Sequence, residues 1–358
     1  MKLGITGTAK SGKTTIFNAV TKLHADTSLY DHLQEPNIGI IPIEDERIDF
    51  LTQLYQPKKK IYATVEFLDF PGISEKTEAH EFLSSTSLSL LRTTDALVIV
   101  LRNFSDSYLD ETYGKANPEQ EYHKILNELL LNDLIIAEKR LEKILLNYKR
   151  GIKSIALQIE EKVLTTVIET LYLEKPISTI KFTKEELLTI KGFQFFTLKP
   201  MMIILNSGEE NYLKNQSILD QLANNLPIYE FTGKFEMELS RMEKDEASIF
   251  MEDLGIPESA VIRIHKAAYI LLGYISFFTV GEDEVRAWTI QKGDNAVTAA
   301  GKIHSDLARG FIRAEVFTYQ DLIVHHNEKT IREKGLFRLE GKNYLVQDGD
   351  IINIRFNI

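Results

Sequence analysis

Gly7-Thr8-Ala9-Lys10-Ser11-Gly12-Lys13-Thr14 follows a short apolar stretch directly and fits G-x-x-x-x-G-K-[ST], the pattern of a phosphate-binding loop. Its glycines allow backbone torsions that a side chain would block, so successive N–H groups can turn towards an anion. Residues 12–22 form an amphipathic pattern, which predicts a helix whose positive end points at the same anion. Lys13 is expected to reach the β- and γ-phosphates, and Thr14 to ligate Mg²⁺. The sequence therefore predicts a nucleotide-binding protein, and we assign to the nucleotide Gly7, Lys10, Ser11, Gly12, Lys13, Thr14 and Thr15.

The composition narrows the class of protein. The chain has 358 residues, of which 44% are apolar, enough for the cores of two or three domains. A net charge of −10 argues against a basic surface all over, although not against a local basic patch. The absence of cysteine excludes disulfides, thiolate metal sites and cysteine nucleophiles. No apolar run reaches transmembrane length and the N-terminus is typical of a core strand, so we expect a cytoplasmic protein without membrane contact.

Strand and helix patterns alternate along the first hundred residues, which predicts a parallel sheet covered by helices. A long helical stretch, residues 118–173 with turn residues at 147–151, predicts an antiparallel helical hairpin. Strand patterns then resume, so the hairpin is an insertion in the nucleotide-binding domain. The predicted strands of this part are 2–6, 37–42, 62–69, 96–101, 200–205 and 227–231, with helices at 45–56 and 257–272, the latter starting near Pro257.

The last eighty residues have a different pattern and predict a small α+β module. Strands are expected at 284–290, 312–317, 344–347 and 351–356, and one helix at 296–308. The expected domains are a nucleotide-binding domain (1–105 and 195–275), a helical arm (106–194) and the C-terminal module (276–358).

Asp69-Phe70-Pro71-Gly72 ends a predicted strand and matches D-x-x-G. An aspartate at this edge of the sheet can hold Mg²⁺ through water, and the Gly72 amide can contact a γ-phosphate. Ras-like GTPases carry a glutamine after this glycine, which orients the attacking water, whereas this chain has Ile73. Isoleucine cannot donate or accept, so either the water is positioned otherwise or turnover is slow.

Asn206-Ser207-Gly208-Glu209 follows the predicted strand 200–205, where guanine-selective proteins have N-K-x-D. We assign Asn206, Ser207 and Glu209 to the nucleotide site. Glu209 is one methylene longer than the aspartate that pairs with guanine, and Ser207 replaces the stacking lysine. Asn206 could serve the N6/N7 edge of adenine, so ATP is favoured over GTP; the alternative is that Asn206 caps a turn. Thr232-Gly233 follows the next strand and is expected to contact the base as well.

With these elements in order, the chain resembles the YchF / Obg-like ATPase family of P-loop proteins, as a divergent member. The resemblance lies in Glu35-Pro36-Asn37-Ile38-Gly39, in Asn206-x-x-Glu209, and above all in the C-terminal motifs at 284–290, 300–304, 310–316 and 339–350. It implies that the C-terminal module is a TGS domain of β-grasp fold, and that a helical arm is inserted in the nucleotide-binding domain. It also implies a preference for ATP and association with ribosomes.

Several positions depart from the family pattern. Lys10 replaces an asparagine that helps to hold a potassium ion in related GTPases; the lysine either substitutes for that cation or is solvated on the loop's outer lip. Leu33-Gln34 stand where a switch threonine is expected, and Ser74-Glu75-Lys76-Thr77 replace a longer stretch. Glu111 stands near the position of the family's catalytic histidine. We therefore assign Lys13, Gly72, Lys10 and Glu111 to the phosphoryl chemistry, with Glu111 as base only after closure.

Two functions are consistent with these residues. One is a regulatory ATPase with slow Mg²⁺-dependent hydrolysis to ADP and phosphate; the other is a nucleotide-gated module that binds ribosomes or RNA without significant catalysis. A small-molecule kinase is disfavoured, because no arginine-rich lid is found. The basic residues Lys139, Arg140, Lys149 and Arg150 mark the hairpin tip as either an RNA-facing patch or a solvated helix end. His304 and Trp288 are expected to cap or pack rather than to react or stack on RNA.

Overall fold

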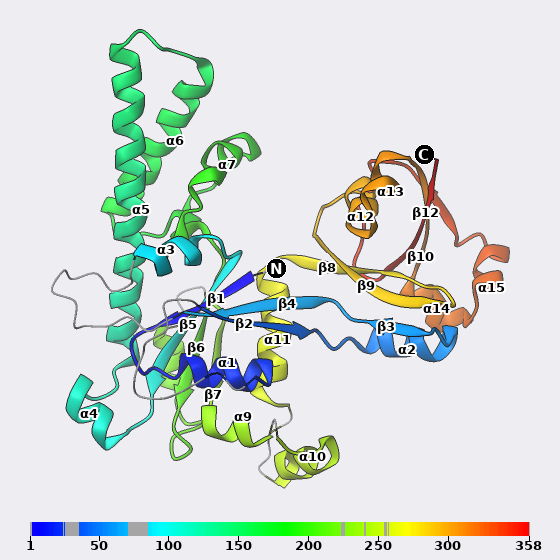
Figure 1. The fold of residues 1–358 in the computed structure, drawn as a ribbon, viewed down its shortest axis with the longest axis horizontal. Helices are drawn as coiled ribbons and strands as arrows, with labels where there is room; N and C mark the ends of the chain where they lie inside the picture. The colour runs from blue at the N-terminus through cyan, green and yellow to red at the C-terminus, as the bar shows by residue number, and fades with distance from the viewer. Residues whose placement is uncertain are drawn as a thin grey trace. The chain divides into compact units, whose positions relative to one another are not determined.

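The computed structural model describes residues 2–23, 25, 36–70, 85–222, 226–239, 241–253, 256 and 258–357 (Figure 1). The chain forms two compact units. The first comprises Met1–Gly39 and Glu66–Ile264, and the second comprises Ile40–Val65 and His265–Ile358. The chain has two six-stranded sheets, one lying mostly in the first unit and one in the second.

The sheet of the first unit has the strand order β2-β4-β1-β5-β6-β7. From β4 to β7 all neighbours run parallel, as predicted. All eight residues of β5 are buried, because helices cover both faces of such a sheet. The carboxyl ends of parallel strands lie at one edge, which gathers the last residues of β1, β4, β6 and β7. The strands are β1 (Lys2–Gly7), β2 (Asn37–Pro42), β4 (Thr64–Asp69), β5 (Ala96–Asn103), β6 (Met201–Ser207) and β7 (Ile228–Phe231).

Short helices connect these strands. The predicted helix after the phosphate-binding loop is α1, and its observed bounds differ by one residue at each end. Five helices, α3, α4, α8, α9 and α10, were not predicted from the sequence. Pro257, the expected start of α11, lies outside the described residues. The helices are α1 (Lys13–Thr21), α3 (Ser85–Arg92), α4 (Ser107–Tyr113), α8 (Gln216–Leu222), α9 (Gly233–Leu239), α10 (Lys244–Asp253) and α11 (Ala260–Leu271).

The predicted helical hairpin is present between β5 and β6 as α5 (Pro118–Lys149) and α6 (Ile155–Tyr172) (Figure 1). Asn117 caps α5 by accepting from the Gln120 N–H at 3.1 Å, and Pro118 occupies the first turn, where its missing N–H costs nothing. An apolar seam between the helices includes Ile144 and Val167. Three 3₁₀ turns (Ile177–Thr179, Lys191–Phe193, Phe196–Leu198) and α7 (Lys184–Ile190) return the chain to β6.

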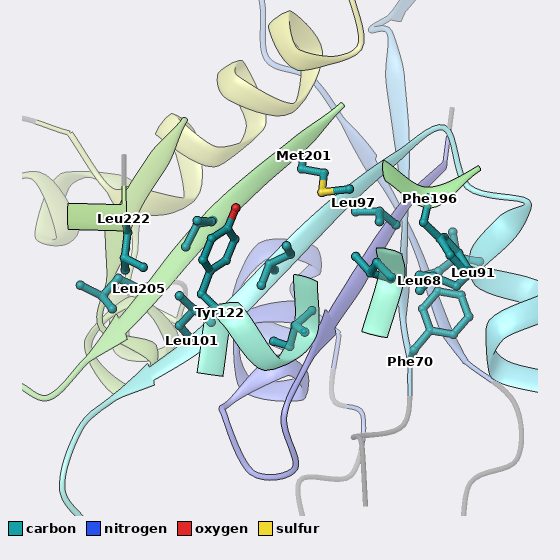
Figure 2. Packing of buried hydrophobic residues seen from close by; sticks show 14 residues of the cluster. Leu68, Phe70, Leu91, Leu97, Leu101, Tyr122, Phe196, Met201, Leu205 and Leu222 are labelled. Carbon is teal, nitrogen blue, oxygen red and sulfur yellow. The ribbon is translucent and has the colours of Figure 1, made fainter. Parts of the chain in front are cut away.

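The first turns of α5 are part of the sheet's own core. Tyr122, Ile125 and Leu129 belong to one buried cluster with side chains of β5 and β6, including Leu101 and Leu205 (Figure 2). The arm is therefore anchored at its root by the same apolar packing that holds the sheet together.

The second unit has the strand order β11-β10-β12-β8-β9-β3. One predicted helix is wrong: residues 296–308 form two helices, because the His304 imidazole Nδ1 accepts from the Asp306 N–H at 3.2 Å and starts a new helix. The predicted strand at 344–347 is also wrong, since Leu345 makes only an isolated bridge to Asn295. The elements are β3 (Lys59–Ile61), β8 (Tyr274–Thr279), β9 (Glu284–Gln291), β10 (Phe311–Thr318), β11 (Arg338–Glu340), β12 (Asp350–Phe356), α12 (Ala296–Ile303), α13 (Ser305–Arg309), α14 (Tyr319–His325) and α15 (Glu328–Glu333).

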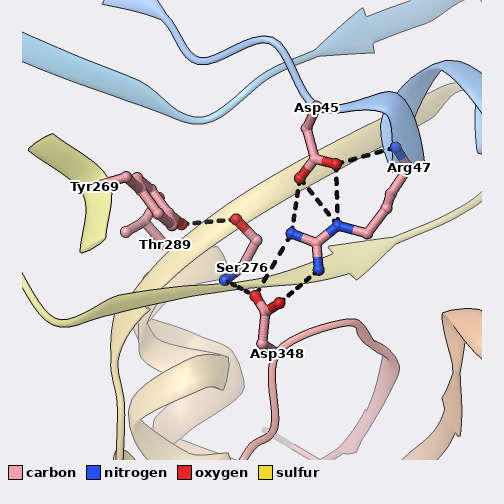
Figure 3. A network of polar contacts seen from close by, with 6 residues as sticks. All are labelled: Asp45, Arg47, Tyr269, Ser276, Thr289 and Asp348. Atoms are coloured by element: carbon pink, nitrogen blue, oxygen red, sulfur yellow. Dashed lines mark hydrogen bonds and ion pairs between the residues drawn. The ribbon is translucent and has the colours of Figure 1, made fainter. Parts of the chain in front are cut away.

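Residues 40–65 belong to the second unit, whereas the predicted boundary assigned them to the nucleotide-binding domain. Strand β3 pairs in parallel with β9, and α2 (Glu46–Tyr55) buries Ile48 and Leu51 in the core of this unit. Within the second unit, Arg47 joins residues 40–65 to the C-terminal segment: it donates to Asp45 at 2.8 Å and to Asp348 at 2.6 Å (Figure 3). Arg47 and Asp348 are 301 positions apart, so no local sequence pattern could predict this pair.

Candidate functional site

Two glycines of the phosphate-binding loop are required by close approaches. A Cβ on Gly12, whose φ is 95°, would lie 2.1 Å from Nδ2 of Asn206. A Cβ on Gly7 would lie 2.5 Å from the carbonyl oxygen of Val100. Any side chain at these positions would push the loop away from β5 and β6, so the loop keeps its shape because both residues are glycine.

Lys13 lies inside the loop and is only 5% exposed. Its Nζ donates to the carbonyl oxygens of Thr8 at 2.7 Å and Gly7 at 3.3 Å. The loop thus encloses an ammonium group at the start of α1, where backbone N–H groups and the helix dipole add further positive potential. A triphosphate is the kind of ligand that this arrangement favours.

Thr14, Asp69 and Asn37 meet at the edge of the sheet. The Thr14 hydroxyl donates to Oδ2 of Asp69 at 2.8 Å, and Nδ2 of Asn37 reaches the same oxygen at 3.2 Å. A hydroxyl and a carboxylate side by side are hard oxygen donors of the type that Mg²⁺ takes, usually together with phosphate oxygens and water. These residues therefore fit the predicted metal.

Asn206, in β6, joins two loops. Its Nδ2 donates to the carbonyl oxygen of Ser11 at 3.0 Å, and its Oδ1 accepts from the Gly233 N–H at 3.2 Å. Gly233 also packs closely on Thr15, since a Cβ there would lie 2.8 Å from the Thr15 methyl group. An amide has two donors and two acceptor positions, so one of each remains for a ligand.

Ser207 is 2% exposed and its hydroxyl donates to Glu230 at 2.6 Å, within a buried network that includes Asn103 and Asn215. In this conformation the Ser207 hydroxyl faces Glu230 and is not directed at a nucleotide as had been predicted. Glu209 is exposed in the turn after β6, while Thr232 is buried and its carbonyl oxygen accepts from the Glu236 N–H at 3.0 Å.

The residues assigned to the phosphoryl chemistry are less closely grouped. Lys10 is partly exposed and adopts a left-handed conformation with φ of 60°, which costs a lysine roughly 1 kcal/mol. Glu111 is exposed on α4. Gly72 lies outside the described residues, as do the departures at Leu33-Gln34 and Ser74–Thr77 and the first residue of the family motif, Glu35.

Comparison with known proteins identifies the family. A model described as 50S ribosome-binding GTPase matches residues 2–140, and the model YchF-GTPase_C, described as a protein of unknown function, matches residues 274–357. The Ribosome-binding ATPase YchF of Bacillus subtilis is 38% identical over 99% of both chains. The chain belongs to the YchF family.

Further YchF proteins support the same assignment. The Ribosome-binding ATPase YchF of Escherichia coli O157:H7 is 34% identical over 100% of this chain and 99% of its own. The solved structure of the Schizosaccharomyces pombe YchF GTPase superposes with a TM-score of 0.86 at 29% identity, and covers 99% of this chain and 97% of the other. The predicted P-loop fold with an inserted hairpin and a C-terminal β-grasp module is therefore confirmed. Among the described helices, none is both long and apolar enough to cross a membrane.

One contact of this YchF chain's phosphate-binding loop was missed by sequence analysis. The Glu121 carboxylate, in the first turn of α5, accepts from the Thr8 hydroxyl and from the Arg102 N–H, both at 3.2 Å. Burial raises the pKa of Glu121, and these hydrogen bonds oppose the rise. Nothing in the spacing of residues 8 and 121 signals this contact.

Proposed function

We propose that this chain is a P-loop nucleoside triphosphatase that binds Mg·ATP in preference to GTP, hydrolyses it slowly and acts on or near ribosomes in the cytoplasm. The observation that carries the proposal is the convergence of Lys13, Thr14 and Asp69 at one edge of the sheet, beside a loop that only glycine can build. The relatives named above as ribosome-binding ATPases support the reaction and the partner.

In this proposal the chain's own residues bind and orient the phosphates. The loop N–H groups and Lys13 take the β- and γ-phosphates, while Thr14 directly and Asp69 through water would hold Mg²⁺, which when bound supplies neutralising charge for the phosphoryl oxygens. Lys13 would exchange its bond to the Thr8 carbonyl oxygen for the phosphates. Gly72, assigned to the γ-phosphate, remains a prediction.

Base preference rests on three residues. With Ser207 buried against Glu230, no long cationic side chain covers the base from this position as a lysine would. Glu209 is one methylene longer than the aspartate that pairs with guanine, so the fit to guanine is poor. Asn206 keeps a donor and an acceptor for the adenine N6/N7 edge. Together they support adenine.

Slow turnover is supported by the outward position of Glu111 and by Ile73 in place of a water-orienting glutamine. We propose that the Lys10 ammonium replaces the monovalent cation of related enzymes, so exchanging K⁺ for Na⁺ should leave the rate unchanged. A strong K⁺ requirement would contradict this role. The second candidate, a nucleotide-gated binding module, predicts that single-turnover phosphate release stays flat for hours.

Ribosome association would involve the arm, the TGS-like module, or both. At the tip the charge is smaller than the sequence indicated, because Arg140 makes two hydrogen bonds to Glu160, at 2.6 and 2.7 Å. Lys139, Lys149 and Arg150 are exposed and remain the residues for rRNA phosphates.

Calorimetric titration of the purified chain with ATP and with GTP, each with and without Mg²⁺, tests the nucleotide proposal. We expect tighter binding of ATP, and weaker binding of both nucleotides without the metal. Equal or tighter GTP binding would overturn the base assignment and leave an ordinary GTPase. No binding of either nucleotide would overturn the proposed function.

A further inference from the structure

The root of the arm reaches the phosphate-binding loop through one side chain. Asn117 and Pro118 set the start of α5, and Tyr122 fixes its first turn in the sheet core, 5% exposed. Between these anchors Glu121 has little freedom to move, and its carboxylate is directed at Thr8, the second residue of the loop. The contact joins residues 113 positions apart.

Thr8 links Glu121 to the lysine that is assigned to the phosphates. The Thr8 hydroxyl donates to Glu121, while the Thr8 carbonyl oxygen accepts from Nζ of Lys13 at 2.7 Å. A change in the backbone torsions of Thr8 would therefore disturb both bonds at once. The carboxylate is held from its other side by the Arg102 N–H, at the end of β5.

The position of the Glu121 carboxylate is set by these hydrogen bonds, because the positively charged groups near it act on it only through their charge. The Arg102 guanidinium is directed at Asp110 of α4, 3.4 Å away, and acts on Glu121 only through its charge. Lys124, one turn further along α5, also acts through its charge. The Thr8 hydroxyl lies 3.2 Å from the carboxylate oxygen, so this bond is one of ordinary strength that ties the loop to the root of α5.

We propose that Glu121 is a positioning residue of the nucleotide site, which acts through the Thr8 hydroxyl to hold the phosphate-binding loop and joins that loop to the root of the helical arm. The inference rests on the proposed function, because it needs a nucleotide in the loop. Glu121 itself does not touch the phosphates. Loosening its bond should cost nucleotide affinity.

A double-mutant cycle tests this role. Thr8→Val removes the hydroxyl at nearly constant shape, and Glu121→Ala removes the acceptor; the affinity for Mg·ATP is measured by calorimetry for both single variants and the double variant. Each single variant should bind about threefold to tenfold more weakly, as expected for the loss of one hydrogen bond. The double variant should lose no more than either alone, because both changes remove the same bond.

Two further variants separate positioning from a general effect on folding. Glu121→Gln keeps an acceptor oxygen and should restore affinity to within about twofold of the wild type, since the geometry is kept without the charge. Glu119→Ala removes an exposed carboxylate from the same turn and should leave affinity unchanged. The melting temperature of each variant without nucleotide reports any loss of fold.

The outcomes distinguish this inference from the proposed function. Wild-type chain that binds no nucleotide would overturn both. Wild-type binding with an unchanged affinity in Glu121→Ala, or additive losses in the double variant, would overturn only the positioning role. A lower melting temperature with unchanged affinity would show that Glu121 merely holds α5 to β5, and would also overturn it.

Discussion

The two ends of α5 are built in opposite ways. At the root, Tyr122 and Ile125 are 5% and 2% exposed in the sheet core, and Glu121 contacts the phosphate-binding loop. Beyond the other end, in the tip loop and the start of α6, Ile152 and Ile155 are 55% and 77% exposed. One continuous helix of 32 residues thus joins a partly buried polar contact with the phosphate-binding loop to an apolar and basic surface. The root should therefore govern nucleotide binding, and the tip should govern partner binding.

The largest effect should come from the loop itself. Lys13→Ala removes the charge assigned to the β- and γ-phosphates, and we expect Mg·ATP affinity to fall by more than about a hundredfold. The measurement is calorimetric titration, with a thermal melt to show that the fold is kept. Retained full affinity would show that Lys13 does not bind the phosphates, and the root of α5 could then not govern nucleotide binding.

The middle of α5 should carry the largest effect on stability. Asp133 is fully buried and accepts from the backbone N–H groups of Phe196 and Thr197 at 2.8 and 2.7 Å, and from the Thr197 hydroxyl at 2.8 Å. Asp133→Asn replaces an acceptor by a donor facing those groups and leaves the nearby Arg92 without its partner charge. The free energy of unfolding should fall by about 2–3 kcal/mol.

Urea denaturation followed by circular dichroism measures this loss. Glu142→Gln, an exposed change on the same helix, is the control and should shift stability by no more than about 0.5 kcal/mol. If the two variants proved equally stable, the arm would not depend on Asp133 to join it to the chain before β6.

The sequence predicts the helices and loop motifs around the root of α5 much better than it predicts the side-chain contacts that the root makes. The periodicity of apolar residues predicts α5 and α6, because this signal is local. The loop motif, Asp69 and Asn206 predict the residues that meet at the edge of the sheet, because each of them follows a parallel strand. The bond between Thr8 and Glu121 has no such signal, since any helix that begins with acidic residues looks the same.

The second unit shows the same limit. Alternating residues predict β9, β10 and β12. Residues 40–65 were expected in the nucleotide-binding domain, whereas they cluster with the second unit, where Arg47 contacts the distant Asp348. Likewise the one-helix prediction for 296–308 missed that the His304 side chain can cap a new helix. The expected capping role of His304, by contrast, is confirmed.

At the tip, charge reversal should change partner binding without changing nucleotide affinity. Lys149→Glu with Arg150→Glu should weaken binding to purified ribosomes by about fivefold to tenfold and reduce its salt dependence, since two phosphate contacts are lost. Lys181→Glu with Lys184→Glu carries the same change of charge on exposed residues outside the tip and is the matched control. Sedimentation with ribosomes at several salt concentrations measures both; equal loss in the two double variants would make the effect one of net charge.

The smallest effect is expected at Arg140, whose position in the sequence looks as basic as that of Lys149. Its guanidinium is already paired with Glu160, so Arg140→Met removes an ion pair that is partly exposed, worth no more than about 1 kcal/mol of stability. Ribosome affinity should stay within twofold of the wild type, because little of this charge is available to a partner. A loss as large as that of the Lys149/Arg150 reversal would mean that the pair with Glu160 opens on binding, and that Arg140 then contacts the ribosome together with Lys149 and Arg150.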